Sequence, residues 1–143
     1  MCGMRKAGVL SFRRLADWLQ GCPRSLRRWI CTAHLALIAV LSLVPSWLFP
    51  PSVAQVPGID KWVHVAMYGV LGVLLRWVTG AKASLADWWR PAAGAGYGLL
   101  MEVLQLWLGG GTRSFSWADA LANLAGVTVF WLLTYKFMGK TAV

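Results

Sequence analysis

The chain has 143 residues, enough for one domain, and its composition is unlike that of a soluble protein. Hydrophobic residues make up 58%, ten residues are tryptophan, and charged residues make up 13%, against roughly 25% in soluble domains. The formal net charge is +9, but half of the fourteen Lys and Arg residues lie within residues 1–28, so a nucleic-acid-binding fold is not expected. Three cysteines without C-x-x-C spacing indicate neither a disulfide framework nor a zinc site.

A basic leader, residues 1–28, is the first feature along the chain. Its segment VLSFRRLADWLQ (9–20) groups apolar side chains against charged ones. This pattern predicts either a short amphipathic helix lying on the inner membrane surface or a disordered basic tail. We divide the rest of the chain into a membrane domain over 29–136 and a short tail over 137–143.

Four apolar stretches follow, and each is long enough to cross a membrane as a helix, which needs about 20 mainly apolar residues. The predicted spans cover residues 29–49, 59–79, 91–108 and 117–135. Prolines follow the first span, a polar connection over 76–90 follows the second, and a glycine-rich turn follows the third. A cleaved signal peptide is disfavoured, because the first stretch is longer than the apolar region of about 7–15 residues that such peptides carry.

The Lys and Arg residues near the span ends predict the direction in which the chain crosses. Twelve fall on the side that receives the leader, the 76–90 connection and the tail, and only Lys61 and Arg113 fall on the other. Tryptophans gather at both sets of span ends, as in interfacial aromatic belts, with Trp131 set deeper. The predicted fold class is therefore all-α: an integral membrane four-helix bundle, multi-pass, with both termini cytoplasmic. The inner halves of the spans are expected to carry few polar side chains.

Polar residues of the last three spans fall at one depth. At 1.5 Å per residue, His64 lies about 6 Å, and Glu102 and Asn123 about 9 Å, inside the outer ends of their helices. Within each helix the polar residues share a face: Asp60, His64 and Tyr68; Glu102 and Gln105; Asp119 and Asn123. A carboxylate at this depth costs about 2–3 kcal/mol unless it finds partners. We therefore expect the three faces to meet in an outward-open polar cup, with Lys61 and Arg113 as counter-charges.

Several of these residues also have purely structural interpretations. Asp60 suits the N-cap of the second span, and the sequence SWAD (Ser116 to Asp119) fits a capping box. Asn123 suits a hydrogen bond between helices. A single histidine with no second His or Cys nearby is more typical of packing than of metal ligation, so neither a metal nor a cofactor is expected. Glu102 is too deep for a cap and is the strongest candidate functional residue.

Three segments together resemble the VanZ-like family of small bacterial membrane proteins: DKWVHVAMYGVLG (60–72), YGLLMEVLQ (97–105) and RSFSWADALANLAG (113–126). They are similar to the family signatures D-K-x-x-H-x-x-x-Y, E-x-x-Q and R-x-x-S-x-x-D-x-x-x-N-x-x-G, and the resemblance covers about residues 29–135. It implies the bacterial cytoplasmic membrane as location and a link to glycopeptide (teicoplanin) resistance, the property of the family's namesake. It also implies a polar site with His64, Glu102 and Asp119 as catalytic candidates. The ligand-binding candidates are Asp60, Lys61, Tyr68, Gln105, Arg113, Ser116 and Asn123.

The expected function is to act on, or to sense, lipids or cell-wall precursors of the bacterial envelope. Lys61 and Arg113 would hold a phosphate or carboxylate, and His64 with Glu102 or Asp119 would form an acid–base pair if a reaction occurs. No activated nucleophile is visible, so an enzyme is not favoured. The expected partners are membrane lipids and a lipid-linked or cell-wall precursor, with a homo-oligomer left open. A non-catalytic scaffold or assembly subunit is the first alternative, and a proton- or solute-coupled transporter is the second.

Overall fold

The computed structural model describes residues 21–45, 48, 58–79, 85–108 and 114–138. These residues form four α-helices and a short 3₁₀ helix, and none of them lies in a strand, which confirms the all-α prediction. The elements are α2 (Arg24–Leu43), α4 (Ile59–Thr79), η2 (Leu85–Trp88), α5 (Trp89–Leu108) and α6 (Trp117–Met138). The amphipathic segment predicted over 9–20 and the end of the tail, 139–143, lie outside the described residues.

Helix α2 begins and ends earlier than the span predicted over 29–49. Pro23 precedes it in an extended conformation, and its carbonyl accepts a hydrogen bond from the Arg27 amide. At the other end Pro45 disfavours a helical conformation at the residue before it, and Val44 is indeed extended. The prolines therefore set both ends of α2, and the last residues of the predicted leader belong to this helix.

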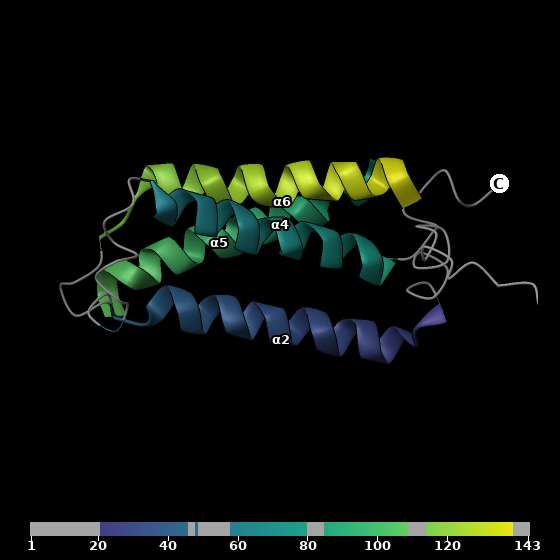
Figure 1. Cartoon of the computed structure of the whole chain (residues 1–143), viewed down its shortest axis with the longest axis horizontal. Coiled ribbons are helices and arrows are strands. Elements are labelled where there is room, and N and C mark those ends of the chain that lie inside the picture. Colours follow the sequence, from purple (N-terminus) through teal and green to yellow (C-terminus); the bar gives the residue numbers. More distant parts are fainter. Residues whose placement is uncertain (1–20, 46–47, 49–57, 80–84, 109–113, 139–143) are drawn as a thin grey trace, which may run out of the picture.

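The four helices run up and down along the long axis of the molecule, with α2 along one side and α6 on the opposite side (Figure 1). Consecutive helices are antiparallel, so α2 begins at the end of the bundle where α6 finishes (Figure 1). The described chain thus enters and leaves the bundle at the same end. We call the opposite end, where α4 and α6 begin, the α6-start end.

Helices α4 and α6 approach each other so closely that only glycine fits between them. A Cβ atom added to Gly72 would collide with the carbonyl oxygen of Val127. One added to Gly126 would lie 2.6 Å from the carbonyl oxygen of Val65. Close backbone approach at small residues is how membrane helices commonly associate. Gly94 and Gly98, which form a GxxxG pair on α5, likewise lie against side chains of α4 and α6.

The interior holds many polar side chains while the outer faces are apolar. Among the residues that the structure describes, the buried polar ones are Arg27, Ser42, His64, Arg76, Glu102, Gln105 and Asn123. Large hydrophobic side chains are exposed on every helix, for example Val40, Val70, Leu106 and Leu121. By length and composition, two helical segments are long and apolar enough to cross a membrane, Arg24–Leu43 and Trp117–Lys136. The other two predicted spans form helices of 21 and 20 residues.

Candidate functional site

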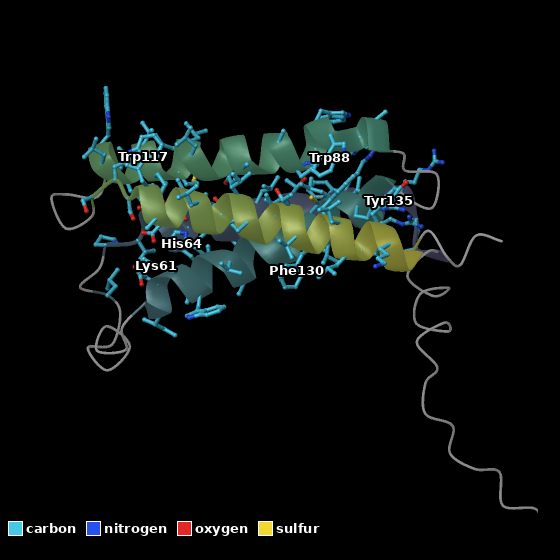
Figure 2. All side chains as sticks on the ribbon, turned by 90° about the horizontal axis from the view of Figure 1, so that it is seen from above. Lys61, His64, Trp88, Trp117, Phe130 and Tyr135 are labelled. Carbon is cyan, nitrogen blue, oxygen red and sulfur yellow. The ribbon has the colours of Figure 1, made fainter. Side chains whose placement is uncertain are left out.

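Polar side chains from three helices meet beneath the α6-start end. His64 of α4 donates a hydrogen bond from Nδ1 to Asn123 Oδ1 of α6 (2.9 Å), and the same nitrogen lies 3.9 Å from Glu102 Oε1 of α5. One nitrogen or oxygen each from His64, Glu102 and Asp119 lie within 4.8 Å of one another. Figure 2 shows His64 and Lys61 at the end of the bundle where Trp117 lies. We call His64, Glu102, Asp119 and Asn123 the polar cluster.

Glu102 occupies the centre of this cluster and is completely buried. Its Oε2 accepts a hydrogen bond from the Ser116 amide (3.3 Å), just before α6 begins. In a full capping box that amide would pair with the side chain of residue 119. Here Ser116 Oγ accepts from the Asp119 amide (3.2 Å), while the reciprocal bond goes to Glu102 instead. Ser116 therefore caps α6 alone, and the interpretation of Asp119 as a capping side chain is wrong.

Lys61 connects the cluster to the surface. Its Nζ lies 2.9 Å from Asp60 Oδ2 and 3.8 Å from Asp119 Oδ1. The side chain of Asp60 is 53% exposed and that of Asp119 only 15%. Helix α4 begins after Gly58, whose carbonyl accepts from the Lys61 and Trp62 amides, so Asp60 stands inside the first turn and is not the N-cap. Asp60 thus belongs to the rim, next to the surface, and Asp119 to the buried part.

Tyr68 and Asn123 form the floor of the cluster, and both are completely buried. A Cβ atom added to Gly98 of α5 would lie 3.0 Å from Tyr68 Cε1 and 3.1 Å from Asn123 Nδ2, so the two side chains meet over this glycine. Tyr68 Oη and Asn123 Nδ2 have no hydrogen-bond partner among the described residues. The floor therefore retains unused hydrogen-bonding capacity.

Two predicted site residues stand apart from the cluster. Gln105 is buried, and its Nε2 donates to the carbonyl oxygen of Ser42 (3.0 Å), near the end of α2. It thereby ties α5 to α2. Arg113 lies outside the described residues, so its predicted role as a counter-charge stays a prediction.

The opposite end of the bundle buries two arginines, which we call the arginine end. Arg27 donates from Nη1 to the Trp77 carbonyl (3.2 Å) and from Nε to the Cys22 carbonyl (3.0 Å). Arg76 is completely buried in α4, with its guanidinium carbon 5.5 Å from the centre of the Tyr135 ring. The sequence predicted few polar side chains in the inner halves of the spans, and it did not predict that these two arginines are buried. The prediction that the polar connection begins at residue 76 is wrong, since α4 continues to Thr79.

A sequence signal for this second region exists in the aromatic residues near the arginines. Trp131 and Tyr135 are four residues apart on α6 and stack at 5.7 Å between ring centres, and Trp88 lies 5.1 Å from Trp131. Figure 2 shows Trp88 and Tyr135 together at this end. Arginine side chains stack readily on such rings. The aromatic spacing on α6 could have indicated a buried cation partner.

Comparison with models of protein families, with curated proteins and with solved structures finds no match.

Proposed function

We propose that the chain is a VanZ-like, multi-pass protein of the bacterial cytoplasmic membrane. The distribution of side chains supports this, because all four helices expose large apolar residues while Arg27, Arg76 and Glu102 are buried in the interior. Soluble monomers rarely expose apolar patches of more than a few hundred Å². Helices of 20–22 residues are about 30–33 Å long. This length matches a hydrocarbon core of about 30 Å.

The proposed orientation places the arginine end at the cytoplasm and the polar cluster near the outer surface. Twelve of the fourteen basic residues flank the first of these ends in sequence. Within the described part of the chain, six exposed tryptophans divide between the two ends, as aromatic belts do. They are Trp29, Trp88 and Trp89 at one end and Trp62, Trp107 and Trp117 at the other. Trp77 is buried against Arg27 and is not part of a belt.

The polar cluster would bind the anionic head group of an envelope lipid or a cell-wall precursor. The observation that carries this proposal is the convergence of His64, Glu102 and Asp119 from three helices, with Lys61 at the rim. Lys61 is half-exposed and is held by carboxylates on both sides. A phosphate arriving at the rim would compete with those carboxylates for the ammonium group. His64 and Glu102, 3.9 Å apart, would be available for proton transfer.

Profiling of lipids and cell-wall precursors in a deletion strain tests this proposal. The wild-type gene and Asp87→Asn should both restore the wild-type profile, whereas Glu102→Gln should not. Asp87 is a matched control because it is a carboxylate of the arginine end, 3.5 Å from Arg90 Nε. Membrane abundance of each variant is measured alongside. Full complementation by Glu102→Gln at normal abundance would overturn the proposed site.

A scaffold or assembly subunit is the second candidate. Three polar side chains bind backbone carbonyls of neighbouring helices: Gln105 at Ser42, Tyr97 at Leu35 and His34 at Met67. Such bonds hold membrane helices together. If the cluster has only this role, Glu102→Gln should lower thermal stability in detergent, and function should fall only in proportion to the amount of folded protein.

A further inference from the structure

We propose that His64, Glu102 and Asp119 bind a divalent cation of the first transition row, such as Mn²⁺ or Zn²⁺. Their ligand atoms lie within 4.8 Å of one another. Ligands at about 2.1 Å from one metal ion stand roughly 3.0–4.2 Å apart. The 3.9 Å between His64 Nδ1 and Glu102 Oε1 places the imidazole ring beside the Glu102 carboxylate, and Nε2 is the nitrogen of that ring proposed as ligand. The sequence led us to expect no metal because it shows a single histidine in this region, but folding adds one carboxylate from each of two other helices.

The donor set suits such an ion. Imidazole nitrogen is preferred by Zn²⁺ and its neighbours in the row, and carboxylates also accept Mn²⁺. Two carboxylates and a dication carry no net charge, which matters where Glu102 is completely buried. Lys61 supplies one positive charge to Asp119 from 3.8 Å, beyond hydrogen-bonding distance. A dication between the two carboxylates would compensate both at once.

A second observation points to a ligand at this place. Asp119 Oδ1 is buried and accepts no hydrogen bond within the described part of the chain. Buried polar atoms without a partner are rare and often mark the position of a water or an ion. The carboxylate is not occupied by the helix cap, because Ser116 performs that role.

The histidine is held as metal-bound histidines usually are. Such residues donate a hydrogen bond from one ring nitrogen to an oxygen acceptor and use the other nitrogen as ligand. His64 Nδ1 donates to Asn123 Oδ1 at 2.9 Å, which orients the ring and leaves the lone pair of Nε2 free. Asn123 is itself completely buried, so the acceptor is fixed in position.

Titration with Mn²⁺ tests the site directly and does not depend on the proposed lipid ligand. The purified full-length chain in detergent is stripped with a chelator, and free Mn²⁺ is followed by its electron paramagnetic resonance signal. We expect one Mn²⁺ per chain and at least tenfold weaker binding in His64→Gln and in Asp119→Asn. His34→Gln and Asp87→Asn are the matched controls and should bind within twofold of wild type. Zn²⁺ should displace the bound Mn²⁺, as the order of stability in the row requires.

A spectroscopic readout separates ligation from a structural role. Pulsed measurements of the Mn²⁺ complex should show modulation by a directly bound imidazole nitrogen in wild type and in His34→Gln, but not in His64→Gln. Circular dichroism establishes that each variant is folded, and Asp119→Asn carries the test if His64→Gln does not fold. No binding by wild type at millimolar Mn²⁺, binding unaffected by Asp119→Asn, or an unchanged nitrogen signal in His64→Gln would each overturn the proposal. If Glu102→Gln fails to restore the lipid profile but the wild-type protein binds no metal, the proposed function stands and the metal site does not.

Discussion

The two ends of the bundle both bury charged side chains, but they use them differently. At the arginine end, Arg27 donates to two backbone carbonyls, and Arg76 lies over the Tyr135 ring. In the polar cluster, Asp119 Oδ1 and Asn123 Nδ2 retain unused bonding capacity within the described residues. Burial of a charge therefore does not by itself mark a functional site. What distinguishes the polar cluster is that His64, Glu102 and Asp119 bring nitrogen and oxygen ligand atoms from three helices within 4.8 Å of one another.

Apolar residues separate the two ends. Leu71, which is completely buried, lies between His64 and Arg76 along α4. Val127, also completely buried, lies between Asn123 and Trp131 along α6. Nonpolar packing at this level gives a solute no polar surface to follow from one end to the other. The transporter alternative is therefore less favoured than binding at one face, although the arginine end also buries two charged side chains.

The largest expected effect removes the packing on which both ends depend. In Gly72→Ala the new methyl group would collide with the Val127 carbonyl, and a backbone atom cannot move aside cheaply. We expect a loss of about 2–3 kcal/mol of unfolding free energy, the upper range for overpacking, measured by SDS titration with circular dichroism. Gly96→Ala is the control, because its Cβ would meet nothing within 4 Å. It should gain about 0.5–1 kcal/mol from helix propensity. Equal stability of the two variants would contradict the described α4–α6 contact.

Arg76→Ala tests whether the arginine end is structural. It removes a completely buried side chain with its ring contact, and we expect a loss of about 2–3 kcal/mol in the same unfolding measurement. Arg28→Ala, on an exposed residue of α2, should change stability by about 0.5 kcal/mol or less. Folded Arg76→Ala protein should still bind Mn²⁺ like wild type. A selective loss of metal binding with stability intact would show that the two ends are coupled.

Glu102→Gln is the corresponding test of the polar cluster. The amide oxygen can still accept the Ser116 N–H bond, so we expect a stability change of about 1 kcal/mol or less. The negative charge is lost, and with it complementation of the deletion phenotype and most of the Mn²⁺ affinity. Glu102→Gln should therefore lose most of its function with little loss of stability. Arg76→Ala should lose stability but keep Mn²⁺ binding once it is folded. A stability loss as large as that of Arg76→Ala would favour the scaffold alternative.

The sequence predicted the helices well because apolar length and helix breakers are local properties. The span predicted over 59–79 coincides with α4. The third span ends at Leu108 and the fourth begins at Trp117, both as predicted. The error at α2 came from reading apolar length alone and giving too little weight to Pro23 and Pro45, which fix its ends. Spacing along single helices likewise placed His64 and Glu102 at one depth.

Which side chains meet between helices was less predictable, since it depends on how each helix is rotated about its axis and on the connecting segments. Glu102 and Gln105 share a helical face by spacing, yet one meets the polar cluster and the other bonds to the Ser42 carbonyl. The close contact at Gly72 and Gly126 determines how α4 and α6 are rotated against each other. A single sequence gives no direct measure of that rotation, so the arginine end was missed and the metal-ligand geometry was not expected.

The smallest expected effect separates cap from ligand within four residues of α6. Ser116→Ala removes the hydroxyl that accepts the Asp119 amide bond and should cost about 1 kcal/mol in the unfolding measurement. Asp119→Asn leaves that bond intact, so its stability should stay within about 0.5 kcal/mol of wild type while its Mn²⁺ affinity falls. Ser116→Ala should show the opposite pattern, with nearly unchanged Mn²⁺ affinity once folded. If Asp119→Asn instead destabilises the protein as much as Ser116→Ala, the Asp119 carboxylate belongs to the helix cap. It would then not be available as a metal ligand in the polar cluster.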